Sequence, residues 1–206
     1  MNLLEVIDYL EENYPSSILE KKEFRGEFSL TLKESDFYQI AQCCRDILGF
    51  DMLLDISSVD YFGRDPRFEV VYELYSLSSK IQLRLKVKLP EDRAAIVTVS
   101  SLWATANWHE REVYDLMGIL FEGHPDLRRI LMWDGYPYHP LRKDFPLEGK
   151  PSEMIDIAFS AAAPLQGGPF VSTPSLGNTQ VREPRHRSAE SSLEKKETQS
   201  MFIAEP

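Results

Sequence analysis

The sequence predicts an α+β fold, a two-layer sandwich in which helices cover one side of a mostly antiparallel sheet, followed by a long irregular C-terminal extension. Three observations support this prediction. Amphipathic helical patterns alternate with β-rich runs, one of these runs alternates strictly between apolar and polar residues, and the chain after about residue 120 is rich in proline and glycine. With 206 residues, 43% of them hydrophobic, the chain is long enough for one domain with a core and a tail.

Helices are predicted in three places. Apolar side chains within residues 3–10 recur at the spacing of a short amphipathic helix, which a proline soon closes. Ser35 is in position to cap a second helix over residues 36–48, with Gly49 just past its end. The third helix covers residues 107–117 and ends at Gly118, and with it the α+β domain of residues 1–118 is complete.

Strands are predicted over five runs, residues 24–32, 52–62, 67–77, 79–90 and 94–103, the last with the weakest pattern. The fourth run places apolar residues on one face and polar residues on the other, as in a half-buried antiparallel strand. The two sets are Ile81, Leu83, Leu85 and Val87 against Gln82, Arg84, Lys86 and Lys88.

Charge and cysteine content exclude several classes of protein. A formal net charge of −10 argues against a general affinity for nucleic acid or anionic lipid. No basic leader and no run of about 18 apolar residues occurs, so contact with a membrane is expected only indirectly, through a partner. The two cysteines, Cys43 and Cys44, are adjacent and are predicted to be free thiols in a reducing cytoplasm, and they are too few for an iron–sulfur cluster.

The chain changes character after about residue 120. Residues 119–160 combine many prolines and glycines with tryptophan, tyrosine, phenylalanine and leucine, a composition that disordered segments lack. We therefore expect this segment to be ordered by packing on another surface. Residues 161–206 turn to glycine, proline, serine and mixed charges, which is typical of an extended or partly flexible tail.

The charged helix over residues 107–117 is the one candidate for a catalytic centre. His109 and Glu110 begin like a zinc protease helix, but the second histidine is required four positions on, where the chain has Val113. No nucleophile elbow and no phosphate-binding loop is present. A self-standing metal-dependent hydrolase that uses His109, Glu110 and Glu112, or a small-ligand binding module, is kept as the alternative function.

The same helix is also a candidate docking surface. Arg111 and Asp115 are four residues apart, so they can pair on one helix face. A solvated helix face explains such charges equally well, but tryptophan and tyrosine beside arginine are typical of interface hot spots. Composition leaves the two interpretations open. Arg111, surrounded by Glu110, Glu112 and Asp115, is then either exposed and dispensable or sequestered with fixed partners.

Two motifs then resemble a known family. The run from Glu110-Arg111-Glu112 through Asp115-Leu116-Met117 and His124 to Arg128 and Ile130-Leu131 resembles the signature of the C subunit of NADH-quinone oxidoreductase, respiratory complex I. The run "HPLRKDFPLEG" at 139–149 resembles the second hallmark of that family. The β-rich pattern of residues 24–100 is compatible with the family's α+β domain.

The resemblance implies a non-catalytic, structural subunit of the peripheral arm of a proton-translocating NADH-quinone oxidoreductase, on the cytoplasmic side of the inner membrane. It implies no cofactor in this chain, with NAD, FMN, iron–sulfur clusters and quinone in other subunits. It also implies docking on the D subunit, the large neighbour that helps to form the quinone cavity, and on neighbouring peripheral-arm subunits, with residues 119–160 wrapping on a partner subunit. Because it places the first motif in the ordered core of the subunit, we expect Arg111 to be sequestered with fixed partners among the neighbouring carboxylates. The signature and interface residues that it indicates are Trp108, Glu110, Arg111, Glu112, Asp115, His124, Arg128, Arg129, His139, Arg142, Lys143, Asp144 and Phe145.

Overall fold

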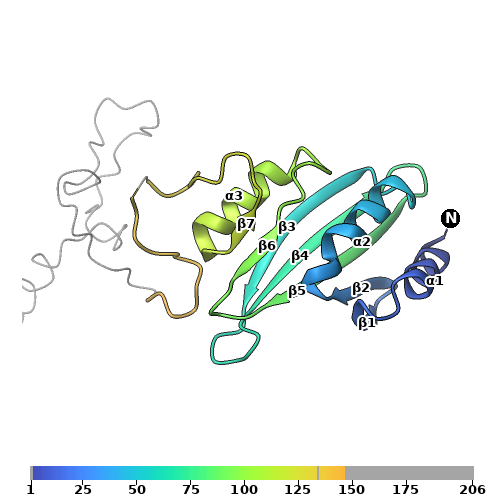
Figure 1. Ribbon diagram of the computed structural model, residues 1–206, viewed down its shortest axis with the longest axis horizontal. Coiled ribbons are helices and arrows are strands. Elements are labelled where there is room, and N and C mark those ends of the chain that lie inside the picture. The colour runs from blue at the N-terminus through green and yellow to red at the C-terminus, as the bar shows by residue number, and fades with distance from the viewer. Residues whose placement is uncertain (1, 134, 147–206) are drawn as a thin grey trace, which may run out of the picture. The chain divides into compact units, whose positions relative to one another are not determined.

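The computed structural model describes residues 2–133 and 135–146. The described residues up to Phe145 form one compact unit (Figure 1). In chain order its elements are α1 (Leu3–Asn13), β1 (Ile18–Phe24), β2 (Glu27–Leu32), α2 (Glu34–Asp46), β3 (Met52–Asp60), β4 (Phe68–Ser76), β5 (Ile81–Leu89), β6 (Ala95–Val97), α3 (Ala106–Met117) and β7 (Leu120–Glu122).

Five of the strands form one sheet in the order β1-β2-β5-β4-β3. The pairs β1–β2, β5–β4 and β4–β3 are antiparallel, and β2–β5 is parallel. The short strands β6 and β7 pair in parallel as a separate two-stranded sheet. The predicted α+β class with a mostly antiparallel sheet is confirmed.

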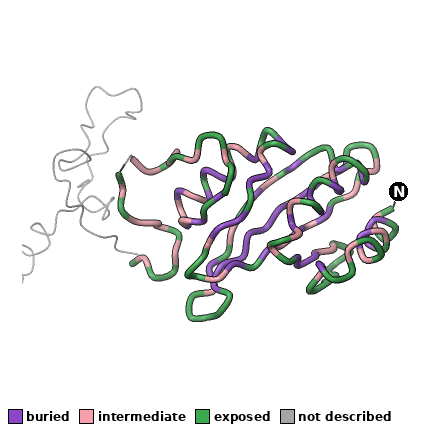
Figure 2. The backbone as a smooth tube through the Cα atoms, in the orientation of Figure 1, coloured by how far each residue is buried: buried purple, intermediate pink, exposed green. Residues whose placement is uncertain are grey.

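The two faces of the large sheet differ in chemistry because strand residues alternate between them. Register pairs such as Leu30 with Leu85 and Tyr72 with Leu85 place buried apolar side chains on one face. The other face carries Thr31, Glu69 and Lys86, and we call it the helix-free face. Figure 2 shows the buried positions concentrated along the central strands and the helix sides that meet them.

All three helices cover the apolar face. Residues of α1, α2 and α3 belong to the same buried core as the inward-facing strand residues. In that core, the ring of Phe37 on α2 lies 4.5 Å from the ring of Tyr72 on β4. Trp103, just before α3, is buried and donates its indole N–H to the carbonyl oxygen of Phe50 at 3.0 Å. The sandwich is therefore two layers, with helices on one side.

Two local predictions were wrong, for identifiable reasons. The run 24–32 is not one strand, because Arg25 and Gly26 both have positive φ and reverse the chain into the β1–β2 hairpin. Helix α2 begins at Glu34, so Ser35 lies within its first turn and not at its N-cap. Strand β7 was not predicted, because three residues are too few to give a periodic signal.

Both cysteines are buried and free, as predicted. They lie on α2, and burial raises the pKa of the Cys43 and Cys44 thiols, which keeps them protonated. Within the described part of the chain, no helix has the length and apolar character needed to cross a membrane.

Candidate functional site

Helix α3 buries most of the charges that the sequence placed on it. Glu110, Arg111 and Asp115 are all buried, whereas Glu112 is exposed and Trp108 is 63% exposed. The interpretation that these charges lie on a solvated helix face is therefore excluded for Glu110, Arg111 and Asp115. The predicted pair of Arg111 with Asp115 does not form, because each side chain is held by the segment that comes after the helix.

Asp115 is bound by residues 129–132. Its Oδ2 accepts three successive backbone N–H groups, those of Ile130, Leu131 and Met132, at 3.0, 2.7 and 2.8 Å, and its Oδ1 accepts Arg129 Nη1 at 2.6 Å. Burial raises the pKa of this carboxyl group, but the four donors outweigh burial and hold the pKa below its usual range. The ionised carboxylate thus fixes the path of a segment without regular structure.

Basic side chains from the same segment cap the C-terminal carbonyls of α3. Arg129 and the Nδ1–H of His139 donate to the Asp115 carbonyl at 2.9 and 3.0 Å, and Arg142 Nε donates to the Met117 carbonyl at 2.7 Å. The amide of Leu141 donates to the intervening Leu116 carbonyl. The guanidinium groups of Arg129 and Arg142 also complement the helix dipole, because they are cations at its C-terminus.

Arg111 is sequestered, but by carbonyl oxygens and an aromatic ring. Its guanidinium donates to the carbonyls of Arg128 and Arg129 at 3.1 and 3.4 Å, and it lies 5.1 Å from the ring centroid of Trp108. The prediction that carboxylates hold Arg111 was wrong, because Glu110 and Asp115 accept hydrogen bonds from other donors. Trp108 covers the buried guanidinium and exposes its other surface.

Glu110 ties α3 to the loop after β6. Its carboxylate accepts the Val99 amide at 2.7 Å and the Thr98 hydroxyl. Burial raises the pKa of Glu110 to about 7, although both of these hydrogen bonds lower it. His124 packs at 3.9 Å from the same carboxylate, donates Nε2–H to the Asn107 carbonyl and accepts the Asp126 amide at Nδ1.

A second buried ion cluster joins the second motif to the sheet. Arg67, 2% exposed, makes two 2.9 Å bonds with Asp60 and one of 2.8 Å with Asp144. The Lys143 amide donates to Asp60 Oδ2 at 2.8 Å. Asp60 and Arg67 were not predicted, because their partners lie up to 83 residues away and no local pattern marks them.

The remaining predicted residues lie at the edges of this arrangement. Phe145 contacts the ring of Tyr138 at 5.8 Å, the end of a chain of aromatic contacts that begins at Trp133. Arg128 is exposed and pairs with Asp126 at 2.9 Å. The Lys143 side chain is exposed, so only its backbone takes part.

The residues of the alternative hydrolase do not share a site. His109 Nδ1 lies 3.3 Å from Asp55 on β3, Glu110 faces Thr98 and Val99, and Glu112 is exposed. Within residues 2–133 and 135–146, no group of three or more His, Cys, Asp or Glu side chains is placed to hold a metal ion.

Comparison with known proteins gives one consistent family. The sequence profile of "Respiratory-chain NADH dehydrogenase, 30 Kd subunit" matches residues 30–151. The C subunit of NADH-quinone oxidoreductase from Geotalea uraniireducens (strain Rf4) is 50% identical over 144 residues, which cover 70% of this chain and 88% of that protein. The C subunit from Geobacter metallireducens is 51% identical over 141 residues, 68% of this chain and 87% of that protein.

Solved structures are similar as well. A structure described as Nqo5 of the trypsin-resistant fragment (1-134) is 35% identical, with a TM-score of 0.55, and covers 62% of this chain and all of that chain. A chain from the membrane-bound sulfane sulfur reductase, an archaeal respiratory membrane complex, has a TM-score of 0.62 at 24% identity, over 70% of this chain and 85% of that chain, and shows the shared fold. The buried signature, the profile match and the relatives together show that this chain belongs to the 30 kDa subunit family of respiratory-chain NADH dehydrogenase, which is the C-subunit family of NADH-quinone oxidoreductase.

Proposed function

We propose that this chain is a non-catalytic structural subunit of the peripheral arm of a proton-translocating NADH-quinone oxidoreductase, and that it docks on the large quinone-site D subunit. The complex transfers electrons from NADH to quinone, with FMN and iron–sulfur clusters held by other subunits. The chain would lie on the cytoplasmic side of the inner membrane and reach the membrane only through its partners.

The observation that carries this proposal is that the charged side chains of the signature make their hydrogen bonds within this chain. Asp115, Arg129, His139 and Arg142 hydrogen bond one another or the end of α3, and we call α3 with these capping residues the platform. Because these motif side chains are already engaged within the chain, their role is structural, and this supports the proposal of a structural subunit.

Large apolar side chains remain exposed on this platform. Trp108, Leu131 and Leu141 are 63%, 61% and 57% exposed, and they come from α3 and the two segments that cap it. A tryptophan beside an arginine is typical of the energetic centre of a protein interface, and the exposed leucines add apolar area that a partner can bury. We assign this patch, Trp108 with Leu131 and Leu141, as the surface that the D subunit covers, and we call it the apolar docking patch.

The docking patch is tested by changing it without changing the platform. We expect the Leu131→Asp/Leu141→Asp double variant to be recovered with the isolated complex at roughly a tenth of the wild-type level, because a carboxylate buried in an apolar interface is left unpaired. Quinone reductase activity should fall in step with the amount of assembled complex. The assay is quantification of the chain against the other subunits of the purified complex, with activity normalised to assembled complex.

Leu4→Asp is the matched control, because Leu4 is 59% exposed on α1, at the other end of the sheet (Figure 1). It should assemble like wild type. Normal assembly of the double variant would show that the apolar docking patch is not part of the interface. Normal assembly with a collapse of activity per assembled complex would instead show a catalytic role for this region.

A further inference from the structure

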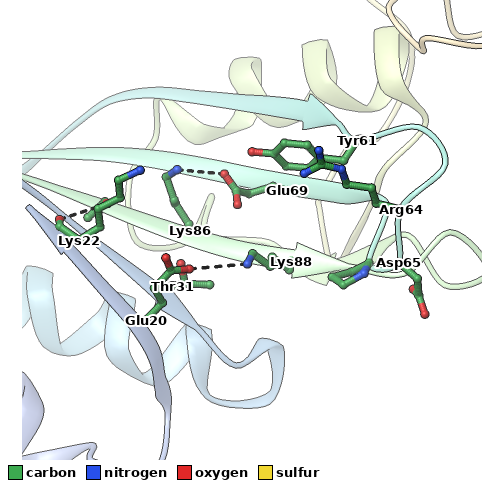
Figure 3. Close-up of a pocket in the computed structure, with 11 residues that line it drawn as sticks. Glu20, Lys22, Thr31, Tyr61, Arg64, Asp65, Glu69, Lys86 and Lys88 are labelled. Atoms are coloured by element: carbon green, nitrogen blue, oxygen red, sulfur yellow. Dashed lines mark hydrogen bonds and ion pairs between the residues drawn. The ribbon is translucent and has the colours of Figure 1, made fainter. Parts of the chain in front are cut away.

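The helix-free face of the sheet has a shallow recess that the apolar docking patch does not include. It has a volume of about 310 Å³ and is bounded by β1, β2, β5, the start of β4 and the loop between β3 and β4. Its charged side chains include Glu20, Lys22, Arg64, Glu69, Lys86 and Lys88 (Figure 3).

Two of the cations in the recess are already paired. Lys86 Nζ lies 3.0 Å from Glu69, which is only 4% exposed and forms the floor. Lys88 Nζ lies 3.7 Å from Glu20 on β1. Each of the two strand carboxylates in the recess therefore has a lysine ammonium group of β5 within ion-pair distance.

Lys22 and Arg64 are the cations that remain. Neither has a carboxylate within ion-pair distance in the described part of the chain, and both are exposed. Lys22 comes from β1, and Arg64 comes from the β3–β4 loop, where its guanidinium lies 5.8 Å from the ring centroid of Tyr61. Figure 3 shows them at opposite ends of the recess, with the carboxylate of Asp65 directed away from its centre.

The formal charge of the recess has the opposite sign to that of the whole chain. The recess is lined by four cations (Lys22, Arg64, Lys86, Lys88) and three carboxylates (Glu20, Asp65, Glu69), a formal charge of +1, whereas the whole chain carries −10. Charge complementarity selects and steers an anionic partner to such a place. Because the free cations are at two ends of an open recess, a ligand with carboxylates spread along a surface fits better than a single small anion.

We propose that the helix-free face is a second docking surface, which receives an acidic surface segment of a neighbouring protein subunit, with Lys22 and Arg64 as the groups that its carboxylates pair with. This inference rests on the chain being part of a multisubunit complex. It goes beyond docking on the D subunit, because it uses the opposite side of the sheet from the helices and a different chemistry.

The test is a charge reversal in the full-length chain within the complex. Lys22→Glu/Arg64→Glu is compared with wild type and with Lys80→Glu, an exposed lysine of the β4–β5 turn that has no ion pair among the described residues. The purified complex is washed with increasing NaCl, and the amount of this chain that is retained is measured. Thermal unfolding of each isolated variant checks that the fold is intact.

We expect the double variant to be released at lower salt than wild type, with retention about fivefold lower at low ionic strength and a difference that shrinks as salt screens the charges. Lys80→Glu should behave like wild type. Lys22→Gln/Arg64→Gln, which removes the attraction without adding repulsion, should be intermediate, and it serves as the deciding variant if the double reversal impairs folding.

Three results would overturn the inference. The first is identical retention of the double variant and the Lys80→Glu control across the salt series. The second is release of the wild-type chain by inorganic phosphate beyond that by NaCl at matched ionic strength, which would indicate a small-anion site. The third is loss of a salt-sensitive self-association in the double variant, which would indicate a second copy as the occupant. Failure of the wild-type chain to co-purify with any complex subunit would instead contradict the proposed function.

Discussion

A single buried carboxylate organises much of the irregular chain after α3. Asp115 binds three successive amides and one guanidinium, and its backbone carbonyl binds Arg129 and His139. The sequence separation of these partners is 14 to 24 residues. Removing the carboxylate therefore leaves several buried donors unpaired at once, whereas removing an exposed carboxylate costs little.

We expect Asp115→Ala to lower the free energy of unfolding by about 3–5 kcal/mol, and Asp126→Ala, whose pair with Arg128 is exposed, by less than about 1 kcal/mol. Urea unfolding at pH 7 measures both. Since the folded pKa of Asp115 is below its unfolded value of about 3.9, its contribution is present above that pH and is lost as pH falls through the folded pKa. Equal costs for the two variants would show that the amide contacts contribute nothing.

Glu110 has the opposite linkage. Burial raises its pKa to about 7, above the unfolded value of about 4.3, so the folded state holds a proton that the unfolded state has released between these two values. Below about pH 4.3 this pKa shift does not change the free energy of unfolding. As pH rises from there toward 7, the shift lowers the free energy of unfolding progressively, and above about pH 7 the reduction is constant.

Glu110→Gln removes this titration while an amide oxygen can still accept the Val99 N–H. We expect the variant to gain stability relative to wild type as pH rises from 5 to 8, by on the order of 2–3 kcal/mol in total. Urea unfolding of both proteins at pH 5, 6, 7 and 8 gives the difference directly. A constant difference across this range would mean that Glu110 is ionised throughout in the folded chain.

At the scale of the element, the end of α3 depends on a glycine for two separate reasons. Gly118 has φ +73°, the left-handed conformation of a helix C-cap. A β-carbon there would lie 2.4 Å from Arg142 Nη2 and 2.6 Å from the His139 ring. These are the side chains that cap the helix, so an added methyl group disturbs the cap as well as the backbone.

We expect Gly118→Ala to lower the free energy of unfolding by roughly 2–4 kcal/mol. This is the sum of about 1 kcal/mol of backbone strain and the loss of the displaced capping contacts. Gly63→Ala is the matched control, because Gly63 has φ +80° but nothing within 4 Å of an added β-carbon. It should show the backbone cost alone. Thermal or urea unfolding of the two variants separates the contributions, and equal losses would show that Arg142 and His139 move aside without cost.

At the scale of the whole molecule, the folded unit includes the segment after α3. The described residues up to Phe145 form one compact unit, and Asp144 reaches Arg67 while Lys143 reaches Asp60. The domain boundary predicted at residue 118 stays a prediction, and these contacts favour a later one. Wrapping of residues 119–160 on a partner is likewise a proposal, and part of this segment also packs on its own chain.

We expect a chain of residues 1–146 to unfold cooperatively with near-wild-type stability, because it retains the partners of Asp115, Arg67 and the α3 carbonyls. A chain of residues 1–118 should be less stable by about 3 kcal/mol or more, since Asp115 and the α3 carbonyls lose those partners. Urea unfolding and limited proteolysis compare both with the full-length chain. Equal stability of the two truncated chains would support the boundary at residue 118.

The sequence by itself determined the fold class and much of the element order. Alternation in 79–90 and helical spacing in 3–10 are local signals, and each was confirmed as β5 and α1. The left-handed end of α3 was also visible, because Gly118 follows a periodic run. The family resemblance was visible for the same reason, since both motifs are contiguous in the chain.

Only the tertiary structure decided which charges meet. The expected pair of Arg111 with Asp115 is local, but burial made backbone amides, carbonyl oxygens and distant guanidinium groups the better partners. Asp60 and Arg67 carried no signal, because their link to residues 143 and 144 exists only after the sheet brings them together. Periodicity reports which face of an element is buried, whereas the partner of a buried charge depends on contacts that are distant in sequence.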